Sequence, residues 1–319
     1  MTTIPLGSGG EFDRVRAIAA ALGDVIGPIG DDTAVIGDGE GTLVVSIDAS
    51  VEDVHFRRNW LSLEEIGWRA TASALSDLAA AAATPIGVVA AVVVPLGAGQ
   101  DALVEVMRGV GAATASVGAR ILGGDLSSGK QWTVVITVFG RAVRRMSRVG
   151  AVPGDGIWVS GAIGGARAAL QAWTTNMAPD LAARRAFAHP TPRIAAARWL
   201  AEHGATAMMD LSDGIGGDAE HLAAASGVQL QIELERLPLH PSVRAAARHV
   251  GEAPERFAAQ AGEDYELLVT LPSTFADTLE FARIHELPLT RIGTVAAGSG
   301  VPATLAGVTQ SVHGFRHAV

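Results

Sequence analysis

The sequence of 319 residues contains no cysteine. This absence excludes disulfide bonds, thiol catalysis and thiolate metal ligands, and it agrees with a reducing cytosol. The first residues, MTTIPLGSGGEF, lack the basic end and apolar run of a secretion signal, so we expect a cytoplasmic protein. One apolar run, residues 78–96, is long enough to span a bilayer, but Pro85 and Gly87 interrupt it. We interpret this run as the end of a helix, a turn and a strand covered on both faces, and we expect no membrane association.

Lysine is nearly absent from the chain. Lys130 is the single lysine, and arginine supplies the remaining positive charge. A P-loop needs Gly-Lys followed by Ser or Thr, and the segment SGKQW around Lys130 lacks that element, so this class of phosphate site is excluded. The formal net charge of −9 argues against a nucleic-acid-binding surface. Any phosphate chemistry must therefore use other groups.

The chain is too long for one ordinary hydrophobic core, so we expect two α/β domains. The segment 141–156, RAVRRMSRVGAVPGDG, concentrates arginine and turn residues, and it places the boundary near its beginning, giving domains 1–143 and 144–319. The patterns predict strands at 42–48 and 131–140, a helix at 60–83, a glycine-rich loop at 121–129, and a strand, glycine turn and helix from 157. A short strand entering a helix at 207–226 and a strand after residue 264 complete the expectation.

Six aspartates share a context, because each follows a strand, lies in a glycine turn or belongs to a helix of small residues: Asp32, Asp48, Asp77, Asp125, Asp210 and Asp213. Each one alone has an ordinary explanation as a turn former or helix cap. As a set they offer the oxygen ligands that Mg²⁺ requires. Asp31 and Asp32 in GPIGDDTAVIG repel each other unless water, a cation or N–H donors screen them. The glycine turn GAIGGA at 161–166 is either a phosphate contact or simply a tight turn.

Several motifs, in this order and over essentially the whole chain, resemble those of thiamine-monophosphate kinases: GEFDRV, IGDDTAV, VEDVHF, ALSDLAA, GGD, PGDGIWVSG, DLSDG, GEDYELL and a C-terminal GF.H. The resemblance implies the fold named after aminoimidazole ribonucleotide synthetase. In that fold the sheet of an N-terminal domain, which binds ATP and Mg²⁺, pairs across a homodimer, and a C-terminal α/β domain follows. The resemblance also implies direct transfer of the γ-phosphoryl group of ATP to thiamine monophosphate, assisted by several Mg²⁺ ions.

The same resemblance implies roles for individual residues. The metal ligands would be Asp32, Ser46, Asp48, Asp77, Asp125, Asp210 and Asp213, of which Asp210 and Asp213 would also be catalytic. The contacts to ATP would be Gly124, Asp125, Arg148 and Ser212, and those to the thiamine part His55, Glu263 and Phe315. These roles are physically sensible, because phosphoryl transfer needs positioning and charge neutralisation rather than a covalent nucleophile. A solvated arginine, an ordinary His55 contact and a C-terminal anchor at Phe315 remain open alternatives.

Three positions depart from the family pattern. Ile47 replaces the usual threonine before the strand-end Asp48, Leu126 follows the GGD motif, and Ala261 replaces a glycine before GEDYE. Alternation along 42–48 puts Ile47 on the face opposite to Asp48, and we expect Ile47 to point into the core.

Two other functions remain open. The first is another ATP-using enzyme of the same superfamily, and the purine-precursor type is favoured there because the carbamoyl and selenium types rely on cysteine or selenocysteine. The second is a non-catalytic nucleotide-binding paralogue, for which Ile47 and Leu126 are the only indications.

Overall fold

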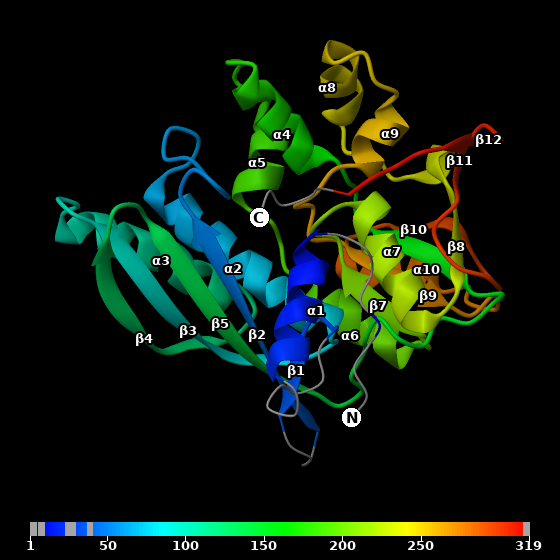
Figure 1. Ribbon diagram of the computed structural model, residues 1–319, viewed down its shortest axis with the longest axis horizontal. Helices are drawn as coiled ribbons and strands as arrows, with labels where there is room; N and C mark the ends of the chain where they lie inside the picture. Colours follow the sequence, from blue (N-terminus) through cyan, green and yellow to red (C-terminus); the bar gives the residue numbers. More distant parts are fainter. Residues whose placement is uncertain (1–4, 6–9, 23–29, 37–40, 315–319) are drawn as a thin grey trace.

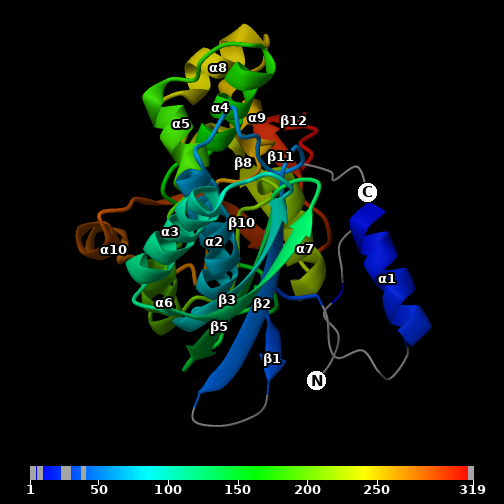
Figure 2. The same cartoon turned by 90° about the vertical axis from the view of Figure 1, so that its left-hand side faces the viewer.

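The computed structural model describes residue 5 and residues 10–22, 30–36 and 41–314. Its first half contains α1 (Gly10–Leu22), β1 (Ala34–Ile36), β2 (Thr42–Val51), α2 (Leu63–Ala80), β3 (Thr84–Pro95), α3 (Gln100–Ser116), β4 (Arg120–Gly129) and β5 (Thr133–Ala142). The strands form one sheet in the order β1-β2-β5-β3-β4, in which only the β3–β4 pair is parallel. Helices α2 and α3 cover one face of this sheet (Figure 2).

The second half is built on a seven-stranded sheet in the order β12-β11-β8-β10-β6-β9-β7. Its elements are β6 (Gly156–Ser160), α4 (Gly165–Thr174), α5 (Leu181–Ala188), α6 (Ile194–Glu202), β7 (Ala207–Asp210), α7 (Ile215–Ser226), β8 (Gln229–Glu233), η2 (Leu234–Arg236), α8 (Val243–His249), α9 (Pro254–Ala259), β9 (Leu267–Leu271), α10 (Thr278–His285), β10 (Leu289–Ala296), β11 (Ala303–Leu305) and β12 (Val308–Gln310). Figure 1 shows the two sheets side by side with α2 between them. No helix among the described residues is long and apolar enough to cross a membrane.

Helix α2 is the central element, because it packs on β2 and β5 of its own sheet and on α5, α6 and β7 of the second half. It begins with a capping box, in which Ser62 and Glu65 satisfy each other's backbone N–H groups. Its tight crossing with α3 depends on two glycines. A Cβ at Gly67 would lie 2.0 Å from the carbonyl oxygen of Val106, and one at Gly109 would lie 1.8 Å from that of Glu64.

The predicted glycine-rich loop at 121–129 is wrong, because these residues form strand β4. Glycine is generally unfavourable inside a strand, but in β4 the absence of a side chain permits close pairing with β3. A Cβ at Gly124 would lie 2.1 Å from the carbonyl oxygen of Ala90. Tertiary pairing therefore overrides the local preference of the sequence.

The expectation that Ile47 points into the core is also wrong. The alternation along β2 is as expected, but the buried face is the one that carries Val44, which is fully buried, whereas Ile47 is 63% exposed on the outer face. Leu122, 56% exposed, lies over Gly87 on that same outer face. Strand β3 is correspondingly buried on one face only, not on both as expected. The sheet thus has a covered face toward α2 and an uncovered apolar face.

Candidate active site

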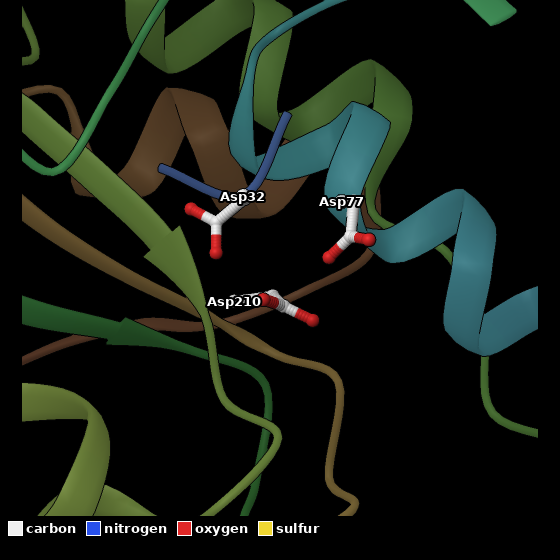
Figure 3. Close-up of side chains that lie close together, drawn as sticks. All are labelled: Asp32, Asp77 and Asp210. Atoms are coloured by element: carbon white, nitrogen blue, oxygen red, sulfur yellow. The ribbon is translucent and has the colours of Figure 1, made fainter. Parts of the chain in front are cut away.

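Three aspartates from distant parts of the chain converge beside α2. Asp32 precedes β1, Asp77 lies in the last turn of α2, and Asp210 ends β7. Each offers one carboxylate oxygen, and these oxygens lie within 4.8 Å of one another. Figure 3 shows the three side chains around a common space. This arrangement joins both halves of the chain at one point.

Burial and mutual repulsion disfavour the ionised forms of these carboxyls. Burial is the main cause that raises the pKa of Asp77 well above its ordinary value, and the charges of Asp48, Asp210 and Asp32 add to it, although a hydrogen bond from Ser46 opposes the shift. Burial and the charge of Asp32 raise the pKa of Asp210 to about 7. Burial also raises the pKa of Asp48. The cluster therefore holds more negative charge than its surroundings neutralise, which is the condition for binding a cation.

The two adjacent aspartates of the GPIGDDTAVIG turn have different surroundings. Asp31 is paired with Arg145 at 2.6 Å and accepts the backbone N–H of Arg148 at 3.2 Å. Asp32 forms an ion pair with the guanidinium group of Arg148, while its second oxygen, Oδ2, is buried without a hydrogen-bond partner among the described residues. Asp32 is thus the member of the pair that belongs to the cluster. Arg148, expected at ATP, lies against Asp32.

The loop after β7 brings Ser212 and Asp213 to the same region, and a second loop holds it in place. The carbonyl oxygen of Ser212 accepts the N–H of Glu263 at 2.7 Å, and the carbonyl oxygen of Leu211 accepts that of Tyr265 at 2.8 Å. Glu263 and Tyr265 both have positive φ, 67° and 52°. Non-glycine residues adopt this conformation at a cost, and such strain is concentrated at functional sites.

Two residues that the sequence did not single out support these loops. Asp218, buried in the first turn of α7, accepts the backbone N–H of Asp213 at 3.0 Å. Arg69, buried in α2, pairs with Glu263 at 2.5 Å. The signal in the sequence was a charged residue within a run of small or apolar ones, GWRATASAL for Arg69 and GGDAEHL for Asp218.

Gly124 and Asp125 do not join the cluster of their own chain. Both are exposed on β4, and the register Asp48–Ile136–Ala90–Gly124 places them three strands from Asp48, about 14 Å away. The pleat turns Asp125 toward the outer face, opposite to the side that carries Asp48. A metal or ATP contact by these residues within one chain does not follow from this geometry.

Two of the residues expected at the thiamine part, His55 and Phe315, differ in what the structure describes of them. Nδ1 of His55 accepts the backbone N–H of Val51 at 3.0 Å, which leaves Nε2 as the nitrogen that can carry the proton of the neutral ring. Phe315 lies outside the described residues. The preceding Gly314 packs on α7, where a Cβ at Gly217 would lie 3.1 Å from its Cα.

The glycine turn at 161–166 makes no open anion site. The N–H of Gly164, at the start of α4, donates to both carboxylate oxygens of Asp264 at 2.9 Å. Asp264 is partly buried, and desolvation of its carboxylate raises its pKa well above the ordinary value. The positive end of α4 is already occupied by a side chain of the protein, which favours the tight-turn interpretation.

Comparison with known proteins identifies similar domains and similar proteins for most of the chain. The N-terminal domain model of AIR synthase related proteins matches residues 30–142, and the C-terminal domain model matches residues 152–305. The thiamine-monophosphate kinase of Halobacterium salinarum is 36% identical over 260 residues, covering 81% of this chain and 84% of that protein. The enzyme of the same name from Aquifex aeolicus is 31% identical over 285 residues, covering 87% of this chain and 92% of that protein.

A solved structure agrees with these relatives. It is described as AaThiL complexed with AMPPCP and TMP, and it superposes with a TM-score of 0.86 at 30% identity, covering 97% of both chains. The chain belongs to the thiamine-monophosphate kinase family.

Proposed function

We propose that this protein transfers the γ-phosphoryl group of ATP to thiamine monophosphate, giving thiamine diphosphate. The observation that carries the proposal is the convergence of Asp210, which is buried, with the partly buried Asp32 and Asp77, and a carboxylate oxygen of Asp32 that has no hydrogen-bond partner among the described residues. The similarity to kinases of this name and to a complex with AMPPCP and TMP supports it.

The cluster suits Mg²⁺, because its donors are carboxylate oxygens and the described residues around it provide too little positive charge to balance them. We assign the metal-binding role to Asp32, Asp77 and Asp210, supported by Asp48, Ser46 and Asp213. Bound Mg²⁺ would neutralise phosphate oxygens as charge develops on them during transfer. Asp210 and Asp213 are the residues to which we assign the catalytic role.

The residues of the chain itself hold the reactants. Ser212, in the loop that follows Asp210, and Arg148 are proposed to orient the triphosphate, with Arg148 adding positive charge beside Asp32. Glu263, His55 and Phe315 are proposed to bind the thiamine part. The transferred group would then pass between two substrates held in line, with no covalent intermediate on the protein.

We also propose that the protein is a cytoplasmic homodimer whose first domain, residues 1–143, pairs through the outer face of its sheet, with residues 144–319 as the second domain. That face is apolar and uncovered, with Ile47 and Leu122 exposed. In such a dimer Gly124 and Asp125 become available to the site of the partner copy. Sedimentation at micromolar concentration tests this, and a monomer would contradict it.

The activity itself is tested by incubating the protein with ATP, Mg²⁺ and thiamine monophosphate and separating the products by chromatography. Thiamine diphosphate should form, and EDTA or Asp213→Asn should abolish its formation while the far-UV circular dichroism stays unchanged. A parallel reaction with a purine precursor as acceptor tests the main alternative. ATP consumption there, with none in the presence of thiamine monophosphate, would reject the proposed acceptor.

A further inference from the structure

Helix α2 takes part in an ion pair that spans the two halves of the chain, between Arg69 and Glu263. Arg69 of α2 is only 5% exposed, and its Nη2 lies 2.5 Å from Oε2 of Glu263. Its Nη1 donates to the carbonyl oxygen of Phe187 in α5, and the guanidinium carbon lies 3.7 Å from the centre of the Phe187 ring. Arg69 is therefore fixed from one side by α5 and presents its remaining charge to Glu263.

Glu263 is held both through its backbone and through its side chain. Its backbone N–H is bound to Ser212 at 2.7 Å, in the loop that carries Asp213, and its side chain is bound to Arg69. The side chain is 25% exposed, and Oε1 has no hydrogen-bond partner within the part of the chain that the structure describes. One oxygen is thus used by the protein and the other is available to a ligand.

The pair also has a defined distance from the acidic cluster. Arg69 and Asp77 are eight residues apart in α2, about 12 Å along the helix axis. Tyr265, the single tyrosine of the chain, is close to both the ion pair and the acidic cluster, because the charges of Glu263, Arg69 and Asp210 all affect its pKa. The same helix therefore places Arg69, the partner of Glu263, about two turns from the aspartate that it contributes to the acidic cluster.

We propose that Arg69 is a positioning residue that fixes Glu263 so that Oε1 accepts an N–H donor of the acceptor substrate, such as the amino group of a heterocycle. The inference rests on the proposed function and deepens it. Because Arg69 already balances the charge of Glu263, the pair recognises a hydrogen-bond donor and not an isolated positive charge. Arg69 contacts the substrate only through Glu263.

The test measures steady-state kinetics for wild type, Arg69→Gln, Glu263→Gln and the double variant, varying thiamine monophosphate and ATP separately. Arg69→Gln should raise KM for thiamine monophosphate about tenfold or more while changing kcat and the KM for ATP less than about threefold. The double variant should be no worse than Glu263→Gln alone, because Arg69 acts through Glu263. Arg69→Lys, which keeps a charge beside Glu263, should recover most of the loss.

Arg184→Gln is the matched control. Arg184 of α5 also pairs with a glutamate of α2, Glu65, at 2.6 and 2.8 Å. This pair lies at the capped start of α2. Its loss should lower the melting temperature without changing either KM. The inference is overturned if Arg69→Gln behaves like Arg184→Gln, or if the effects of the Arg69 and Glu263 substitutions are additive. An inactive wild type would instead reject the proposed function.

Discussion

Two groups of buried carboxylates in this protein differ in how their charge is balanced. Glu266 is 4% exposed. Its carboxylate accepts hydrogen bonds from Nε of Arg193 at 2.9 Å and from the hydroxyl of Ser160 at 2.5 Å. Asp210 is equally buried and Asp77 is partly buried, but their charged neighbours include further carboxylates. A protein stabilised only by its own contacts would avoid the second arrangement, since burying unbalanced charge is costly. The difference marks where a cation from solution is expected.

The largest effect is expected from Asp77→Asn. Turnover should fall by about a thousandfold or more, because the cation loses a charged ligand. In metal-free buffer the same variant should be more stable than wild type by about 1 kcal/mol or more, because one repelling charge is gone. Activity assays and thermal unfolding in EDTA measure the two effects. A less stable variant in EDTA would show that repulsion does not govern this cluster.

Glu266→Gln should have the opposite profile. The isosteric amide keeps the hydrogen bond with Ser160 but leaves the charge of Arg193 unbalanced, so unfolding should become easier by about 2–4 kcal/mol. Urea unfolding with and without Mg²⁺ measures the loss. Added Mg²⁺ should stabilise this variant no more than it stabilises wild type. A specific rescue by Mg²⁺ would remove the distinction between the two groups.

The pH dependence of metal-free stability sharpens the comparison further. The pKa of Asp210 is raised to about 7 in the folded chain from an ordinary 3.8, so the folded state binds the proton more tightly than the unfolded state. The stability contributed by this group is therefore fully present below about pH 4 and is lost as the pH rises to about 7. Thermal unfolding in EDTA across this range should show the decline, Asp210→Asn should flatten it, and saturating Mg²⁺ should oppose it. A wild-type profile that matches that of Asp210→Asn would contradict the assignment.

The smallest effect is expected from Ile47→Thr. Because Ile47 lies on the outer face and not in the core, the free energy of unfolding of the single chain should change by no more than about 0.5 kcal/mol, and the Mg²⁺ requirement should be unchanged. Val44→Thr, at the fully buried position of the same strand, provides the control and should cost several times more. Equal losses at the two positions would mean that the outer face is covered in solution, as in the proposed homodimer, and that the expectation for the single chain does not apply to the protein as measured.

The sequence predicted much of the acidic site, because strand ends and glycine turns are local features. Asp32, Asp77 and Asp210 each have such a context, and the structure brings them together. The contacts of Arg69 could not be predicted, because its partner Glu263 is 194 positions away and no local pattern links the two. Alternation along β2 separated Ile47 from Asp48 correctly, but alternation alone does not say which face packs on α2.

The expectation for β4 failed for a related reason. Glycines in the segment 121–129 have no intrinsic preference for a strand, and the need for Gly124 is explained only by the carbonyl of Ala90 in the neighbouring strand. Residues whose role depends on a distant partner, such as Asp125 on the outer face, are therefore the ones for which sequence patterns carry the least information.

The close contact of α3 with α2 at Gly109 makes the geometry of the acidic site sensitive to a substitution far from it. Gly109 touches the first turn of α2, and Asp77 lies thirteen residues beyond Glu64, about 20 Å along the helix. A methyl group at position 109 would displace the first turn of α2. If the helix moved as a rigid body, its other end would carry Asp77 away from Asp210. An alanine at this buried position of α3 would then lower the activity without altering any residue that contacts a substrate.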